Sequence, residues 1–288
     1  MPTDSLVFKT LQAQAEYLAA YQAALGLWPV PFQELDIPTR FGSTHLIASG
    51  PPDAPPLVML HGNFAGATMW YPNAAALSKS HRLLAVDTLG EPGKSAPSRL
   101  PACRADYAAW LIDVLDGTGS GRVDLGGMSY GGALALNFAL AAPGRVRRLV
   151  LMCPGVALAP PTPGWLAWAG PMWLFPGEPT VRLFFRHESA LGHLPEAPYV
   201  RQFVLGLAGV RSRKVTQIVV GDDEMRRLAP PALLLIGSAD ILYDAQAATR
   251  RACELIPTME THIIPEAGHG LNRDQPEVVG EYILRFLS

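Results

Sequence analysis

One short glycine-rich stretch around Ser129 constrains the fold of this chain more than any other feature. Residues 126–132 read GGMSYGG, so glycines stand two residues before and two residues after the serine. An apolar run ending at Leu125 precedes this stretch, and the alanine-rich run 133–142 follows it. The pattern G-x-S-x-G at a turn from strand to helix is typical of a nucleophile elbow, where glycines let the two backbones approach. Glycine-rich turns of this kind also bind phosphate or only pack closely, so the stretch alone leaves those alternatives open.

Short apolar runs alternate with helical patterns along most of the chain. Strands are predicted at 57–60, 82–86, 123–125, 146–152, 233–236 and 261–264, after a strand pair within 32–49, and helices at 6–25, 106–115 and 133–142. Strands that alternate with helices form a mostly parallel sheet with helices on both faces and right-handed crossovers. The sequence therefore predicts an α/β fold, and functional residues in such folds gather beyond the carboxyl ends of the strands.

The alternation breaks between residues 154 and 228. Prolines and glycines crowd residues 154–179, and Trp165, Trp168 and Trp173 lie among them. The segment is too long for an ordinary connection, and its aromatic content argues against disorder. The predicted organisation is an N-terminal helical arm (1–30), a core (31–153 and 229–288) and an inserted helical lid, here called the lid segment (154–228).

Composition excludes several classes of function. The formal net charge is −2 and 17% of the residues are charged, which gives no basic face for nucleic acid and favours a small-molecule partner. No apolar run approaches the ~20 residues of a membrane span, and no signal-peptide pattern stands at the N-terminus. The three cysteines have no metal-ligand spacing and are expected to be reduced. These features predict a cytoplasmic protein without a stable membrane anchor, although export without a leader would leave the same signs.

A serine becomes a nucleophile when a base takes its proton and a carboxylate orients that base. Asp240 follows the predicted strand 233–236, and His269 lies between glycines after strand 261–264. Asp244 is the alternative carboxylate, but it stands further into the next helical stretch. The predicted catalytic residues are therefore Ser129, Asp240 and His269. No other spacing of His, Asp or Glu suggests a metal ligand set, so neither a metal nor another cofactor is expected.

The order Ser, Asp, His and the surrounding motifs resemble those of the α/β-hydrolase superfamily, in particular its lidded bacterial carboxylesterase-like members. The resemblance covers residues 45–288. It is carried by the elbow and by HGN at 61–63, D-x-x-G-x-x-G-x-S at 87–95, G-x-x-D at 237–240 and GH at 268–269. The pattern at 87–95 has one residue more than the commoner D-x-x-G-x-G-x-S form.

The resemblance implies a serine hydrolase that cleaves a small carboxylic ester through an acyl-enzyme. An aminopeptidase, a lactonase, a carbon–carbon bond hydrolase and a perhydrolase would use the same residues, so motifs do not separate them. A ligand receptor that kept the hydrolase fold is a further alternative, but all three catalytic residues are retained.

The same resemblance implies an oxyanion hole made of two backbone N–H groups. One belongs to Tyr130, directly after the serine, and the other to Asn63, with Phe64 as the neighbour that could replace it. His61 resembles the structural histidine of the family. An apolar substrate pocket is expected from aromatic residues near the elbow and in the lid segment: Trp70, Trp165, Trp168 and Trp173, with Met69, Phe175 and Phe184 as further candidates.

Overall fold

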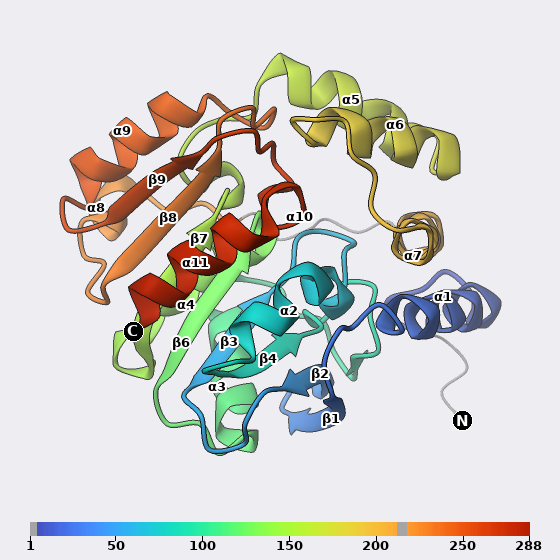
Figure 1. Cartoon of the computed structure of the whole chain (residues 1–288). Helices are drawn as coiled ribbons and strands as arrows, with labels where there is room; N and C mark the ends of the chain where they lie inside the picture. The colour runs from blue at the N-terminus through green and yellow to red at the C-terminus, as the bar shows by residue number, and fades with distance from the viewer. Residues whose placement is uncertain (1–4, 212–217) are drawn as a thin grey trace.

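A nine-stranded sheet forms the centre of the computed structural model, which describes residues 5–211 and 218–288 (Figure 1). The strands are β1 (Phe32–Thr39), β2 (Gly42–Ser49), β3 (Pro56–Leu60), β4 (Arg82–Val86), β5 (Ala96–Pro97), β6 (Val123–Met128), β7 (Val146–Met152), β8 (Ala232–Gly237) and β9 (Glu260–Ile264). Their order is β1-β2-β4-β3-β6-β7-β8-β9, and β5 pairs with β2. Pairing is parallel from β4 through β3 to β9 and antiparallel around β2. The predicted α/β fold is confirmed.

The central strands coincide with the apolar runs of the sequence. Every residue of β6 and β8 is buried, because helices cover both faces of the sheet. Asp124 is the one charged residue in these two strands, and its carboxylate binds the Arg147 guanidinium. The hairpin of β1 and β2 is different, since β1 lies at the edge of the sheet and is mostly exposed, with Ile37 as its one buried residue.

Helices cover both faces of the sheet (Figure 1). They are α1 (Leu11–Leu25), α2 (Tyr71–Leu77), α3 (Arg104–Gly117), α4 (Tyr130–Ala141), α5 (Pro163–Leu174), α6 (Glu178–Glu188), α7 (Ala197–Gly209), α8 (Asp222–Met225), α9 (Ala245–Leu255), α10 (Leu271–Asp274) and α11 (Pro276–Leu287). α2 packs against α11, and α3 packs against α4. No helix within the described ranges is both long and apolar enough to cross a membrane.

The lid segment contributes α5 to α8 between β7 and β8. Figure 1 shows α5 and α6 together beyond one end of the sheet, and α7 beside the N-terminal helix α1. The end of α7 is joined to the N-terminus by a bridge between Phe8 and Val210 and by a hydrogen bond of 2.8 Å from Lys9 N–H to the Gly209 carbonyl. Residues 1–4 of the expected arm and 212–217 of the lid segment lie outside the described residues.

The N-terminal helix is shorter than predicted. It begins at Leu11 rather than at residue 6, because the Thr10 side chain accepts a hydrogen bond of 3.0 Å from the Ala13 N–H and so caps the helix there. The preceding residues run along the end of α7 instead, and Phe8 is buried with Tyr17 and Tyr21.

Candidate active site

Ser129 occupies a sharp turn between β6 and α4. Its backbone has φ 53° and ψ −118°, a combination that residues with a side chain rarely adopt. A Cβ added to Gly127 would lie 2.2 Å from the Gly131 carbonyl oxygen, and a Cβ added to Gly131 would lie 2.2 Å from that of Leu60. The Ser129 N–H donates to the Met152 carbonyl at 2.9 Å. The glycines and the neighbouring strand therefore hold the serine in a strained turn, as the motif predicts.

Asp240 and His269 meet in the loops that follow β8 and β9. His269 Nδ1 lies 3.0 Å from Asp240 Oδ2 and 3.2 Å from Oδ1, and their side chains are 3% and 0% exposed. The Leu242 N–H also donates to Asp240 Oδ1, at 2.7 Å. Asp244, the alternative carboxylate, caps α9 by accepting a hydrogen bond from the Ala247 N–H. The carboxylate that faces the imidazole is thus that of Asp240.

The charges around this pair shift both pKa values. Burial by itself would lower the pKa of His269, but the charge and hydrogen bond of Asp240, helped by the charge of Glu188, outweigh it and raise the pKa. Burial would raise the pKa of Asp240, yet the charge and hydrogen bond of His269 and a hydrogen bond from the Cys153 thiol lower it. Each partner therefore favours the charged form of the other, as an orienting carboxylate must do for a catalytic base.

The loop that carries His269 is fixed from two sides. Asp274 Oδ2 accepts hydrogen bonds from the Gly268 N–H at 2.9 Å and from the Ala190 N–H at 3.0 Å. A Cβ on Gly268 would lie 2.0 Å from the Glu188 carbonyl oxygen, so the loop lies directly against the end of α6. The lid segment therefore contributes to the position of the imidazole.

Ser129 and His269 line one cavity. His269 Nε2 is buried and has no hydrogen-bond partner among the described residues, so the serine hydroxyl does not bond to it in this conformation. Nucleophile–base hydrogen bonds are often long without substrate and shorten when it binds. The shared cavity is therefore compatible with proton transfer between the two side chains.

The two candidate donors of the second oxyanion N–H differ in their surroundings. The N–H of Phe64 donates to Glu91 Oε2 at 3.0 Å, whereas Asn63 follows the His61-Gly62 turn and lines the cavity beside Ser129. His61 Nε2 accepts the Thr88 N–H at 3.0 Å, which is a structural role. Because the Phe64 N–H already has a carboxylate acceptor, the geometry favours Asn63. Tyr130, the other candidate donor, is the first residue of α4, where N–H groups point out of the helix end.

The predicted aromatic residues divide into two groups. Trp165 and Trp173 of α5 line the cavity with Met69 and Phe184, and the Trp165 ring stands edge-on to the His269 imidazole with centroids 5.1 Å apart. The other candidates do not line it, because Trp70 is fully buried in the core, Trp168 stacks on His187 at 3.5 Å, and Phe175 is 72% exposed.

Several cavity residues were not predicted. They come from α6, α7 and α10, and they are Phe185, Glu188, Tyr199, Phe203 and Arg273. The two charged members form a partly buried ion pair, with 3.4 Å between Arg273 Nη2 and Glu188 Oε2. The sequence offered one signal for Glu188. Near the end of α6 this acidic residue lies three and four positions after two phenylalanines, so it shares their face of the helix.

A second cavity also reaches Ser129. It shares Asn63, Phe64, Trp165 and Trp173 with the first cavity and adds Leu166, Ile218 and Leu242. The serine thus lies where two apolar spaces meet, so a substrate could extend in two directions from the reacting carbon.

Among the described residues, one group of side chains has the spacing of a metal site. It consists of Cys153, Asp240 and His269, whose possible ligand atoms lie within 4.8 Å of one another. His269 Nδ1 and the Asp240 carboxylate already bond to each other. A metal ion would have to replace that bond, so the group fits the orientation of a base better than metal binding.

Comparison with known proteins supports the interpretation of the fold. Residues 57–281 match the alpha/beta hydrolase family. Carboxylesterase YbfK of Bacillus subtilis (strain 168) is 37% identical, and the alignment covers 100% of this chain and 98% of that protein. A Pseudomonas putida 2-hydroxy-6-oxo-2,4-heptadienoate hydrolase is 30% identical over 76% of this chain and 84% of its own length.

The three-dimensional comparison agrees. The crystal structure of naproxen esterase (carboxylesterase NP) from Bacillus subtilis has a TM-score of 0.91 and 36% sequence identity, covering 97% of this chain and 100% of that chain. Both the sequence and the fold are similar over nearly the full length. The chain belongs to the α/β hydrolase family.

Proposed function

We propose that this protein is a carboxylic ester hydrolase in which Ser129 is the nucleophile, His269 the general base and Asp240 the residue that orients it. The observation that carries the proposal is the buried His269–Asp240 pair, with Nδ1 3.0 Å from Oδ2, opening on the same cavity as a serine in a strained elbow. The relatives named carboxylesterases support the choice of an ester.

In the proposed reaction, His269 Nε2 takes the proton of the Ser129 hydroxyl while Oγ attacks the acyl carbon. The N–H groups of Asn63 and Tyr130 bind the resulting oxyanion, and each such donor typically contributes ~2.7–4 kcal/mol. The bond to the alcohol oxygen then breaks, and His269 returns the proton to that oxygen. Water attacks the acyl-enzyme with His269 again as the base, and the acid leaves as Ser129 regains its proton.

The residues around the serine favour a small apolar ester with aromatic or branched groups. One cavity is lined by Trp165, Phe184 and Phe203 and the other by Leu166, Ile218 and Leu242, so the acyl and alcohol groups could each occupy one of them. We further propose that residues 154–228 act as the lid over these cavities, with 1–30 as an arm on the core. The three unpaired cysteines support a reducing compartment such as the cytoplasm.

The test of the proposal is replacement of Ser129 by Ala. Rapid release of p-nitrophenol from p-nitrophenyl butyrate should fall by at least ~10⁴-fold, and a fluorophosphonate probe should no longer label the protein. Ser98→Ala is the matched control, because Ser98 is exposed and does not line either cavity. Turnover that survives Ser129→Ala would refute the proposal, and stable ligand binding without labelling of the wild type would indicate a receptor.

A carbon–carbon bond hydrolase is the second candidate, because a relative 30% identical carries such a name. It would use the same three residues, and water would cleave the bond beside a substrate ketone. Comparison of kcat/KM for activated esters and for a vinylogous 1,5-diketone acid separates the two. Preference for the diketone by more than tenfold would favour this second function.

A further inference from the structure

Glu91 lies in the loop after β4, at the place where two residues, Glu91 and Pro92, stand instead of the single one of the commoner D-x-x-G-x-G-x-S spacing. It lies in the longer form D-x-x-G-x-x-G-x-S, at residues 87–95. Its side chain is not at the surface, since the residue is only 2% exposed. Its Oε2 accepts the N–H of Phe64 at 3.0 Å, which connects this loop to the turn after β3. Glu91 therefore holds a backbone N–H of another loop from a position inside the protein.

The turn that receives this bond has strained geometry. Phe64 has φ 60°, in the left-handed region that side chains other than those of Asn and Asp rarely adopt. The Asn63–Phe64 peptide carries the N–H that Glu91 binds, and the peptide before it carries the Asn63 N–H. Because Asn63 separates these two peptides by a single Cα, fixing the orientation of one restricts the other. The strain is thus held in place directly beside the candidate oxyanion hole.

The loop that carries Glu91 is firmly anchored at both ends. Asp87 accepts hydrogen bonds from the Ala67 N–H at 2.7 Å and from the Lys94 N–H at 2.8 Å. The Ser95 hydroxyl donates to the Asp87 carbonyl at 2.8 Å and accepts the His45 N–H at 2.9 Å.

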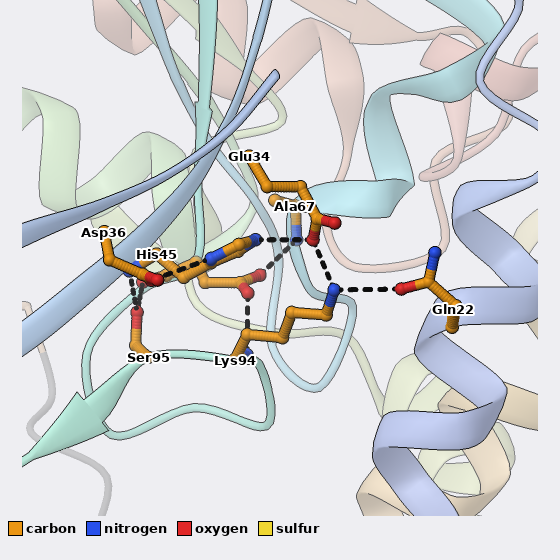
Figure 2. Close-up of polar contacts among 8 residues, drawn as sticks. Gln22, Glu34, Asp36, His45, Ala67, Lys94 and Ser95 are labelled. Atoms are coloured by element: carbon orange, nitrogen blue, oxygen red, sulfur yellow. Dashed lines mark hydrogen bonds and ion pairs between the residues drawn. The ribbon is translucent and has the colours of Figure 1, made fainter. Parts of the chain in front are cut away.

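Beyond these backbone contacts, side chains join the end of the loop to the hairpin and to α1. Figure 2 shows Lys94 reaching both Glu34 of β1 and Gln22 of α1, with His45 between Glu34 and Asp36. These contacts hold the backbone of the Glu91 loop in place. The Glu91 carboxylate can therefore fix the position of the neighbouring turn.

We propose that Glu91 is a positioning residue for the oxyanion hole: it binds the Phe64 N–H, holds the strained turn, and leaves the Asn63 N–H as the donor beside Ser129. The inference rests on the proposed function. It explains why the loop carries the additional residue, and why the carboxylate is buried close to a site that stabilises negative charge. The acceptor, rather than the charge, is the functional feature.

The test compares Glu91→Ala with Glu91→Gln. Glu91→Ala removes the acceptor, and we expect kcat for p-nitrophenyl butyrate to fall 10- to 100-fold while KM changes less than threefold. A boronic acid inhibitor, which forms a tetrahedral adduct on the serine, should lose affinity by a similar factor. Glu91→Gln keeps an oxygen acceptor and should restore most of both quantities. Should the Ala variant fail to fold, Glu91→Asp replaces it. The side chain of Asp is one methylene shorter and does not reach the Phe64 N–H, so this variant should show the same loss of kcat.

Ser95→Ala is the matched control, because it removes two hydrogen bonds from the same loop without touching the turn after β3. It should lower thermal stability yet retain kcat, because the Asp87 bonds to the Ala67 and Lys94 N–H groups still hold the loop. The inference is overturned if Glu91→Ala retains the wild-type kcat, if Gln is as impaired as Ala, or if Ser95→Ala shows the same loss of kcat. Loss of activity in Ser129→Ala together with any of these results would leave the proposed function intact and remove only the role of Glu91.

Discussion

The indole of Trp165 in the lid segment stands edge-on to the imidazole of His269, with ring centroids 5.1 Å apart and an interplanar angle of 64°. Trp165 also contacts Phe184 at 5.3 Å and lines both cavities. A residue of the lid segment therefore limits the space in which the candidate base can move.

Replacing Trp165 by Ala should loosen the imidazole and enlarge the site. We expect kcat/KM for p-nitrophenyl butyrate to fall about tenfold, because small displacements of catalytic groups have large effects on rate. Trp168→Ala is the control within the same helix, since Trp168 stacks on His187 and lines neither cavity. Equal losses in the two variants would show that only the general stability of the lid segment matters.

The pH dependence of activity follows from the charges around His269. The imidazole must be neutral to accept a proton, so activity is lost as the pH falls through its pKa. Burial lowers that pKa, but Asp240 and Glu188 outweigh the effect and raise it above the ordinary 6.5, while the charge of Arg273 lowers it. The acid limb of kcat/KM should therefore have its midpoint above pH 6.5.

Two substitutions should move this limb in opposite directions. Glu188→Gln removes a negative charge that raises the pKa of His269, so the midpoint should move to lower pH. Arg273→Met removes a positive charge that lowers the pKa, so the midpoint should move to higher pH. Shifts of the two variants in the same direction would contradict this electrostatic account.

Asp240 and Asp244 provide a test of the orienting carboxylate. Asp240→Asn should lower kcat by ~10⁴-fold, because an amide donates to Nδ1 and stabilises the wrong tautomer of the imidazole. Asp244→Ala should instead lower the free energy of unfolding by ~1 kcal/mol through loss of the cap on α9, with kcat retained. Urea denaturation and steady-state kinetics on both variants separate the roles, and an exchange of the two results would make Asp244 the partner of His269.

The sequence predicted the parts of the molecule that depend on local pattern. Buried parallel strands are largely apolar, so β3, β4, β6, β7 and β8 could be located directly. The glycines around Ser129 identified the elbow because only a residue without a side chain fits there.

Other features depend on contacts between distant segments and could not be predicted. The choice between Asn63 and Phe64 as donor depends on a hydrogen bond from Phe64 to a residue 27 positions away, Glu91. Which aromatic faces of the lid helices meet the cavity depends on how those helices rotate against the core. For this reason Trp168 points elsewhere, and the contributions of α7 and α10, with those of Phe185 and Glu188 in α6, were missed.

Cys153 supports a last prediction, on metals. Its thiol is buried, its pKa is raised by burial and by the charge of Asp240, and it donates a hydrogen bond to that carboxylate. Since the Cys153, Asp240 and His269 ligand atoms lie within 4.8 Å of one another, Zn²⁺ could bind only by displacing the His269–Asp240 hydrogen bond.

We therefore expect EDTA to leave esterase activity unchanged and micromolar Zn²⁺ to inhibit it. Cys153→Ala should weaken this inhibition at least tenfold, with Cys103→Ala as the control because Cys103 is exposed. Loss of activity on chelation, restored by added metal, would instead assign these residues to a catalytic metal site.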